Sequence, residues 1–221
     1  MRHFDSEIND LQDCLISMAG LVQEMIKVVM KELVDKDLKQ SGVVLCLEKK
    51  VNIQELVIDD KCLKLIALNQ PVGVDLRFIT SAMRINSDLE RMGDEAVNIS
   101  EKAVCLTKNT KFKPLTDIPE MIEIVQDMIM DCIKAFNTND SELALSVLIK
   151  DNKVDNLRNR VFNNLKNLMI KALNVKIIQE AVDLMFIVKS IERLGDHATN
   201  ISEDVIFMVH GKNVRHPKVR R

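Results

Sequence analysis

The chain has 221 residues, of which 47% are hydrophobic and 29% charged, and its formal net charge at pH 7 is −2. This is enough apolar material for one large domain or two of about 100 residues each. The last eleven residues hold five basic side chains and no acid, so the rest of the chain carries about −7, and this acidic body and the lack of Tyr and Trp argue against nucleic acid as a partner. No apolar run approaches the roughly 18 residues of a membrane span, and the N-terminal segment is too acidic for a signal peptide. We therefore expect a soluble, cytoplasmic protein.

Helices are the only regular structure that the sequence predicts. All four prolines lie at the edges of long segments in which apolar residues recur three or four positions apart. The segment 108–116 reads as a linker, with three helices before it and three after it. The expected helices, with ends uncertain by a few residues, are 5–36, 37–68, 75–107, 118–137, 140–171 and 174–210.

One short segment occurs twice in the chain. Residues 90–101 read ERMGDEAVNISE and residues 192–203 read ERLGDHATNISE, and nine of the twelve positions are identical. The copies fall in the third and sixth expected helices, which indicates a tandem duplication of a three-helix unit. The predicted fold is therefore all-α. Its parts are a first three-helix bundle over 1–107, a linker over 108–116, a second bundle over 117–211 and a basic tail over 212–221.

The acidic side chains of each copy lie on one face of their helix. At about 100° per residue, Glu90, Asp94 and Glu101 fall within about 40° of one another, and Glu192, Asp196 and Glu203 repeat this arrangement. Like charges four residues apart destabilise a helix by about 0.2 to 0.5 kcal/mol, a cost that a bound cation would remove. A glycine inside each copy, Gly93 or Gly195, favours the close approach of another backbone or of a ligand.

The neighbouring helices supply further oxygen ligands. The fifth helix carries Asp151 and Asp155, and the second carries Glu48 and Asn52 at the corresponding places, with Glu55 and Asp59 continuing the face. Carboxylate and amide oxygens without thiolates suit Mg²⁺, Ca²⁺, Mn²⁺ or iron. The candidate metal ligands are Glu48, Glu90, Asp94, Asp151, Asp155, Glu192 and Asp196, with Asn52, Glu101 and Glu203 as further candidates.

The same pattern is also typical of ordinary solvated helix faces. In that interpretation Arg84 pairs with Asp88 and Arg91 with Glu95, four residues apart, and such exposed ion pairs contribute almost nothing to stability. His197, present in one copy only, is then a partly exposed polar residue. Spacing alone does not decide between this interpretation and a cation site.

The residues that carry a family resemblance are QPVGVDLRFITSAMRINSDLERMGDEAVNISEKA and FIVKSIERLGDHATNISEDVIFMVHGKNVRH. They resemble the paired signatures of the PhoU family, the phosphate-uptake regulators of bacteria, and the resemblance spans the whole chain. It implies two tandem bundles in which Glu/Asp-xxx-Asp motifs hold metal ions, as iron clusters in some members. Carried over, the first site uses Glu48, Glu90 and Asp94, and the second uses Asp151, Asp155, Glu192 and Asp196.

The two implied sites differ at one position. Asn52 stands in the first half where the second half has Asp155. Because an amide is a neutral and weaker ligand than a carboxylate, we expect the first site to bind metal less tightly or to hold fewer ions.

The resemblance also implies a function that spacing does not show. Such a protein represses phosphate uptake and phosphate-starvation signalling when phosphate is plentiful, by linking the ATPase subunit of the phosphate ABC transporter to a sensor histidine kinase. It reaches the membrane only through these partners. A homodimer is kept as a further expectation. The sequence has no Walker loop or nucleophile elbow, so we do not expect an enzyme.

Two alternatives are kept beside the adaptor. The first is a metal-free helical module for protein interaction, which differs only in what fills the acidic faces. The second is a carboxylate-bridged di-metal enzyme, which is disfavoured because no Glu-x-x-His pair faces a bundle interior.

Overall fold

The computed structural model describes residues 3–35, 41–107, 117–172 and 174–214, and these residues form helices and no strand. The predicted all-α fold is confirmed, and every observed helix end lies within four residues of the predicted one. The predicted linker over 108–116 and the last seven residues of the predicted tail lie outside the described residues. The helices are α1 (His3–Asp35), α2 (Ser41–Asn69), α3 (Gly73–Thr107), α4 (Asp117–Thr138), α5 (Ser141–Lys171) and α6 (Val175–His210).

Short polar residues and one glycine define helix ends in the second half. The side chain of Asp140 accepts hydrogen bonds from two backbone N–H groups of the first turn of α5, both at 3.0 Å, and Asn174 caps α6 by accepting from the backbone of Lys176 at 2.9 Å. The last turn of α6 leads into Gly211, whose φ of 66° is left-handed and therefore favours glycine. These caps fix where α5 and α6 begin and where α6 stops.

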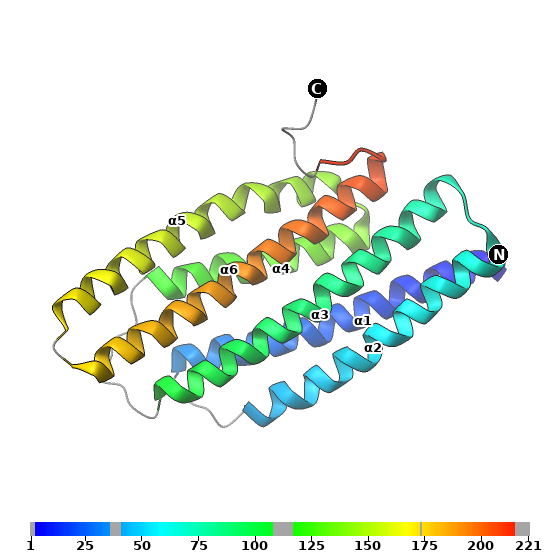
Figure 1. Cartoon of the computed structure of the whole chain (residues 1–221). Helices are drawn as coiled ribbons and strands as arrows, with labels where there is room; N and C mark the ends of the chain where they lie inside the picture. The colour runs from blue at the N-terminus through cyan, green and yellow to red at the C-terminus, as the bar shows by residue number, and fades with distance from the viewer. Residues whose placement is uncertain (1–2, 36–40, 108–116, 173, 215–221) are drawn as a thin grey trace.

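Each half is a three-helix bundle. Helices α1, α2 and α3 pack on one another, as do α4, α5 and α6. The bundles join along α3 and α6, which run antiparallel through the middle of the molecule, and α1 adds a contact with α4 (Figure 1). The outer helices α2 and α5 therefore lie at opposite edges, and each contacts only the helices of its own bundle among the described elements.

The two bundles share one hydrophobic core. Buried aliphatic side chains from all six described helices belong to a single cluster. Aromatic contact also crosses between the halves, where Phe78 of α3 stacks on Phe136 of α4 with ring centroids 6.3 Å apart. The halves are thus repeated units of one packed body.

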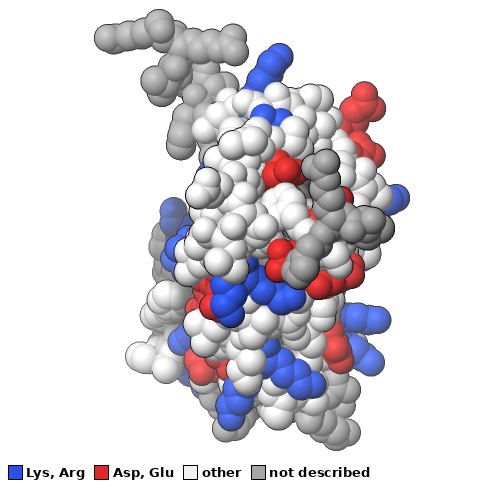
Figure 2. Space-filling view, turned by 90° about the vertical axis from the view of Figure 1, so that its right-hand side faces the viewer, with Lys and Arg blue, Asp and Glu red and all other residues white. Residues whose placement is uncertain are grey.

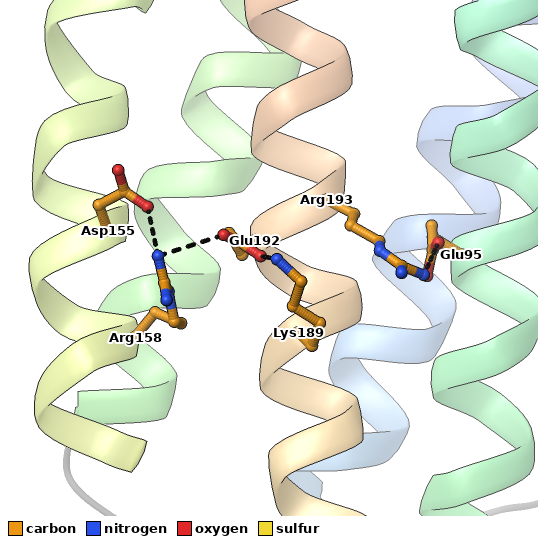
Figure 3. Close-up of polar contacts among 6 residues, drawn as sticks. All are labelled: Glu95, Asp155, Arg158, Lys189, Glu192 and Arg193. Atoms are coloured by element: carbon orange, nitrogen blue, oxygen red, sulfur yellow. Dashed lines mark hydrogen bonds and ion pairs between the residues drawn. The ribbon is translucent and has the colours of Figure 1, made fainter. Parts of the chain in front are cut away.

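Ion pairs cross the contact between α3 and α6. Arg84 lies 2.9 Å from Asp204, whose side chain is fully buried, and Arg193 lies 3.0 Å from Glu95 (Figure 3). The pairing of these residues with neighbours four positions away, expected for a plain solvated face, is therefore not what the structure shows. The repeated segment instead uses some of its charges to join the bundles.

A histidine completes this contact. His197 Nδ1 lies 2.8 Å from Asp88 Oδ1, and Asn200 donates to the same oxygen at 3.1 Å. Asp88 is itself buried, so these two partners offset the cost of removing its carboxylate from water. His197 is partly buried, and it has a role at the contact between the bundles.

The end of the molecule that carries the α2–α3 turn has a mixed surface. Lys and Arg side chains alternate there with Asp and Glu, with uncharged surface between them (Figure 2). The described part of this face offers no uniform basic surface to a nucleic-acid backbone. In the part of the chain that the structure covers, no helix is long and apolar enough to cross a bilayer.

Candidate functional site

The second bundle brings all four of its predicted acids together between α5 and α6. Burial, followed by the charges of Asp196, Asp155 and Glu192, raises the pKa of Asp151 to about 6. Burial, followed by the charge of Glu192, also raises the pKa of Asp196. We call Asp151, Asp155, Glu192 and Asp196 the α5/α6 cluster.

The glycines of the repeat lie beside these acids but do not admit a second backbone. A Cβ placed on Gly195 would lie 3.6 Å from the methyl group of Met128 and 3.8 Å from Asp151 Oδ1. At Gly93 the nearest atom would belong to the Val51 side chain, at 3.5 Å. These are ordinary contact distances, so the close approach expected from the glycines is made by side chains, among them the Asp151 carboxylate.

Two basic side chains already contact the α5/α6 cluster. Arg158 of α5 lies between its two helices, 3.1 Å from Asp155 and 3.4 Å from Glu192 (Figure 3). Lys189 of α6 also pairs with Glu192. Because Glu192 is buried, these cations offset much of the cost of its charge.

The first bundle brings its predicted acids together between α2 and α3. Burial, followed by the charge of Asp94, raises the pKa of Glu90, and burial, followed by the charge of Glu48, raises the pKa of Asp94. Asn52 donates to Glu48 Oε1 at 2.8 Å, while its own Oδ1 is buried without a hydrogen-bond partner. An unsatisfied buried carbonyl oxygen beside several carboxylates is a suitable ligand for a hard cation.

Further along α2, two more acids extend this group. Burial, followed by the charges of Asp59 and Asp94, raises the pKa of Glu55. Asn86 of α3 donates to Asp59 Oδ1 at 2.9 Å and to the backbone oxygen of Glu55 at 3.0 Å. We call Glu48, Asn52, Glu55, Asp59, Glu90 and Asp94 the α2/α3 cluster.

Two further candidates lie about two helical turns beyond these groups. Glu101 follows Asp94 by seven residues on α3, and Glu203 follows Asp196 by seven on α6. Neither is among the charges that raise the pKa of Asp94 or Asp196. Glu101 and Glu203 therefore remain candidates from the sequence pattern alone.

The side chains of the clusters are near one another without forming a coordination shell. In the described part of the chain, no group of three or more His, Cys, Asp or Glu side chains is arranged to hold a metal ion. The donor chemistry nevertheless fits a hard cation, because the raised pKa values show carboxylates crowded together and Asn52 adds an oxygen without a partner.

Comparison with known proteins decides the family. The model of the PhoU domain family matches residues 15–103 and again residues 118–205. The chain belongs to the PhoU family. Each matched segment falls within one three-helix bundle, so the duplication inferred from the repeated segment coincides with two PhoU domains.

Relatives of this PhoU chain match over nearly its whole length. The phosphate-specific transport system accessory protein PhoU homolog of Pseudomonas putida is 31% identical, covering 100% of this chain and 86% of the relative. That of Aquifex aeolicus is 35% identical, covering 97% and 96%.

Two solved PhoU structures have the same fold. The crystal structure of PhoU from Pseudomonas aeruginosa aligns with a TM-score of 0.91 at 31% identity, covering 95% of this chain and 100% of that one. The crystal structure of the phosphate transport system regulatory protein PhoU from Streptococcus pneumoniae aligns with a TM-score of 0.87 at 25% identity, covering 96% and 99%.

The two basic residues that contact the α5/α6 cluster were not predicted from the sequence. Arg158 follows Asp155 by three residues and Lys189 precedes Glu192 by three, a spacing at which helical side chains meet. That spacing was available in the sequence as a signal. The charge of an acidic helix face therefore has to be assessed together with the basic residues three and four positions away on the same helix.

Proposed function

We propose that this chain is a regulatory accessory protein of a phosphate-specific transport system. It lowers phosphate uptake and phosphate-starvation signalling when phosphate is plentiful, by linking the ATPase subunit of the ABC transporter to a sensor histidine kinase. The supporting observation is that PhoU domains cover both bundles, while the named relatives align over nearly the whole chain. The chain then acts as an adaptor at the inner face of the membrane, without catalysing a reaction.

A pull-down from the native host tests the adaptor role. Tagged protein is recovered from cells grown in high and in low phosphate, and the co-purified proteins are identified by mass spectrometry. We expect the transporter's ATPase subunit or the sensor kinase in high phosphate. Recovery of neither protein, together with an unchanged phosphate-starvation reporter in a strain lacking this chain, would contradict the proposal.

We further propose that the two clusters bind divalent cations or iron. In the α2/α3 cluster the ligands would be Glu48, Glu90 and Asp94, with Asn52 supplying its unpartnered carbonyl oxygen. In the α5/α6 cluster they would be the four carboxylates of that cluster. A bound cation would supply the positive charge that relieves repulsion among half-buried acids, and this stabilises the packing of α2 on α3 and of α5 on α6.

We propose an order of the two sites opposite to the one that the sequence favoured. The sequence favoured a stronger second site because Asp155 is charged where Asn52 is neutral. In the structure, however, Arg158 and Lys189 already pair with acids of the α5/α6 cluster. Since a metal ion there has to compete with these cations, we now expect the α2/α3 cluster to bind the first equivalent.

Elemental analysis and thermal melting together test the cation sites. Protein purified without chelator is expected to contain Fe, Mn, Mg or Ca, and added Mn²⁺ is expected to raise Tm above its value in EDTA. If no metal is retained and no metal ion moves Tm, the metal-free interaction module is the better interpretation. That result would leave the proposed adaptor role intact, because the pull-down does not depend on metal.

A further inference from the structure

The hairpin of α5 and α6 ends in a tip that extends beyond the packed core. The last buried side chain of α5 is Leu165, and the first buried side chain of α6 is Glu180. None of the described residues between these two is buried, and they lie at the left end of the molecule in Figure 1. We call these residues, 166–172 and 174–179, the α5–α6 tip.

The α5–α6 tip is both apolar and basic. Ile170 is 82% exposed and Val175 is 78% exposed, although both are large apolar residues. Lys166, Lys171 and Lys176 are exposed as well, and the sequence from 166 to 179 contains no acid. In the part of the chain that the structure describes, none of these lysines is paired with an acid. Three positive charges therefore surround exposed apolar side chains without a counter-charge from the protein.

The opposite end of the molecule shows that a hairpin tip in this fold need not be basic. The turn between α2 and α3 also exposes apolar side chains, since Leu68 and Val72 are each 78% exposed. There, however, Lys64 pairs with Asp60, and Asp75 lies in the first turn of α3. Acidic and basic side chains are mixed on that face (Figure 2). Unopposed positive charge therefore distinguishes the α5–α6 tip from its counterpart in the first bundle.

This combination fits an anionic lipid surface better than a protein partner. Anionic headgroups attract clustered lysines, and apolar side chains among the lysines can enter the boundary between headgroups and acyl chains. Lysine is depleted in protein–protein interfaces, whereas at a membrane its long side chain reaches the headgroups with the ammonium group. We propose that the α5–α6 tip docks this chain directly on an anionic membrane surface, with Ile170 and Val175 inserted among the headgroups.

The acids of α5 and α6 nearest to the tip do not oppose such docking. On α6, Glu180 is buried and Asp183 pairs with Lys102 at 3.3 Å. On α5, the nearest acid is Asp155, which lies outside the tip and pairs with Arg158 at 3.1 Å. The charge that these two helices present at this end is therefore positive. Docking by a tip also needs no spanning helix, and the described residues contain none.

Co-sedimentation with lipid vesicles tests the docking, with EDTA present so that metal ions play no part. The wild-type chain is expected to bind phosphatidylcholine vesicles that contain about one-third phosphatidylglycerol, less so as salt rises, and not to bind pure phosphatidylcholine. The triple variant Lys166→Gln, Lys171→Gln, Lys176→Gln should bind more weakly by on the order of a hundredfold, about fivefold for each charge. The matched control, which should bind nearly as the wild type does, replaces three exposed lysines of α1 and α2 by Gln: Lys27, Lys49 and Lys50.

A single tryptophan tests the insertion itself, because the natural chain contains no Trp or Tyr. In Ile170→Trp, the anionic vesicles should shift the emission to shorter wavelength, and brominated phospholipid should quench it. The control is Leu68→Trp, at a similarly exposed place in the opposite turn, and it should show neither change. Circular dichroism checks that both variants keep their helices.

The outcomes separate docking on lipid from docking on a protein. The proposal is overturned if the wild type does not bind anionic vesicles, if the triple variant binds as well as its control, or if brominated lipid quenches both tryptophans alike. If vesicles are not bound but the triple variant loses the ATPase subunit or the kinase in the pull-down, the tip contacts an acidic protein surface instead, and the lipid proposal also fails. The vesicles contain no transporter, so the proposed adaptor role is tested independently.

Discussion

The two acidic clusters occupy equivalent places in the two bundles but handle their charge differently. In the α5/α6 cluster, Arg158 contacts both Asp155 and Glu192, and Lys189 contacts Glu192 again. In the α2/α3 cluster, the position that corresponds to Arg158 is Glu55, whose pKa is raised by burial and by neighbouring acids. One cluster therefore has two cations in direct contact with its acids, whereas the other gains a further carboxylate and is offset by the neighbouring charge of Arg91, which counteracts the rise that burial causes in the pKa of Glu90.

This difference shows how a duplicated unit can be specialised without altering its backbone. Both clusters use residues four apart on one helix facing the repeated segment on the next. Two positions decide whether the acids are already paired: Arg158 and Lys189 in the second half stand where the first half has Glu55 and Ser87. The pair of bundles thus provides, in one molecule, a cluster expected to respond strongly to cations and one expected to respond less.

Removing the internal cation should have the largest effect. Arg158→Met keeps most of the aliphatic contact but takes this cation away from Asp155 and leaves the buried Glu192 with Lys189. We expect the free energy of unfolding to fall by about 2 kcal/mol at pH 7 in EDTA. Added Mn²⁺ should then raise the free energy of unfolding of this variant by more than it raises that of the wild type. Urea unfolding followed by circular dichroism measures both quantities.

The control for that experiment is Lys153→Met, which removes an exposed cation from the same helix. It should change stability little. If Arg158→Met is no more destabilising than this control, Arg158 does not neutralise the α5/α6 cluster and the contrast between the clusters fails.

The raised pKa of Asp151 predicts the next largest effect. Because its pKa is about 6 in the fold against 3.8 ordinarily, the folded state binds a proton more tightly than the unfolded chain. Its contribution to stability therefore falls as pH rises from about 4 to about 6 and stays low above that range. Asp151→Asn should stabilise the protein at pH 7.5 by about 1 kcal/mol, after allowance for solvent screening, and have little effect near pH 4.

Unfolding measured across pH 4 to 8 in EDTA checks this prediction. The exposed Asp13→Asn serves as the control and should leave the pH profile unchanged. A profile for Asp151→Asn that runs parallel to that of the wild type would show that Asp151 does not titrate in this range.

Giving the first cluster the cation of the second should make the two alike. Glu55→Arg places a guanidinium where Arg158 stands in the other half, so the metal-free protein should gain about 0.5 kcal/mol. The same change should abolish the tighter of the two Mn²⁺ binding events in calorimetry. Glu55→Gln, which removes the charge without adding a cation, is the control and should weaken that event less. Loss of the weaker event alone would reverse the proposed order of the sites.

The sequence predicted the fold well because its signals were local and repeated. Periodic apolar residues indicated the helices, Pro71 and Pro119 lay near their ends, and the repeated segment at 90 and at 192 indicated the duplication. The residues of each cluster followed from the same spacing, since acids four apart on neighbouring helices of one bundle meet between them.

Contacts between the bundles could not be predicted in the same way. Nothing in the spacing of α3 says that Arg84 reaches Asp204, 120 residues later, rather than Asp88. Such pairs depend on the relative position of α3 and α6 in their antiparallel packing, which the spacing of residues within one helix does not predict. The exposure of Ile53 and Leu56 on α2 was likewise not predicted, because an apolar residue in a helix is ordinarily assigned to a core.

An equally small change in stability is expected for Asn52→Asp, the substitution that bears most directly on why the clusters differ. The substitution gives the α2/α3 cluster the carboxylate that Asp155 provides in the other half. It removes the hydrogen bond that Asn52 donates to Glu48, and it adds a charge, so the metal-free protein should lose about 0.5 kcal/mol.

Cation binding should respond in the opposite direction to metal-free stability. If the number of carboxylates sets affinity, Asn52→Asp tightens Mn²⁺ binding to the α2/α3 cluster, because a charged oxygen replaces a neutral one while no internal cation has to be displaced. The reciprocal control, Asp155→Asn, removes a carboxylate that Arg158 already pairs with, and should weaken binding to the α5/α6 cluster only slightly. Calorimetric titration of both variants compares the two changes. If Asp155→Asn instead weakens Mn²⁺ binding by more than Asn52→Asp tightens it, the metal ion displaces Arg158 from Asp155 at little cost in free energy. The number of carboxylates alone would then decide which site binds more tightly.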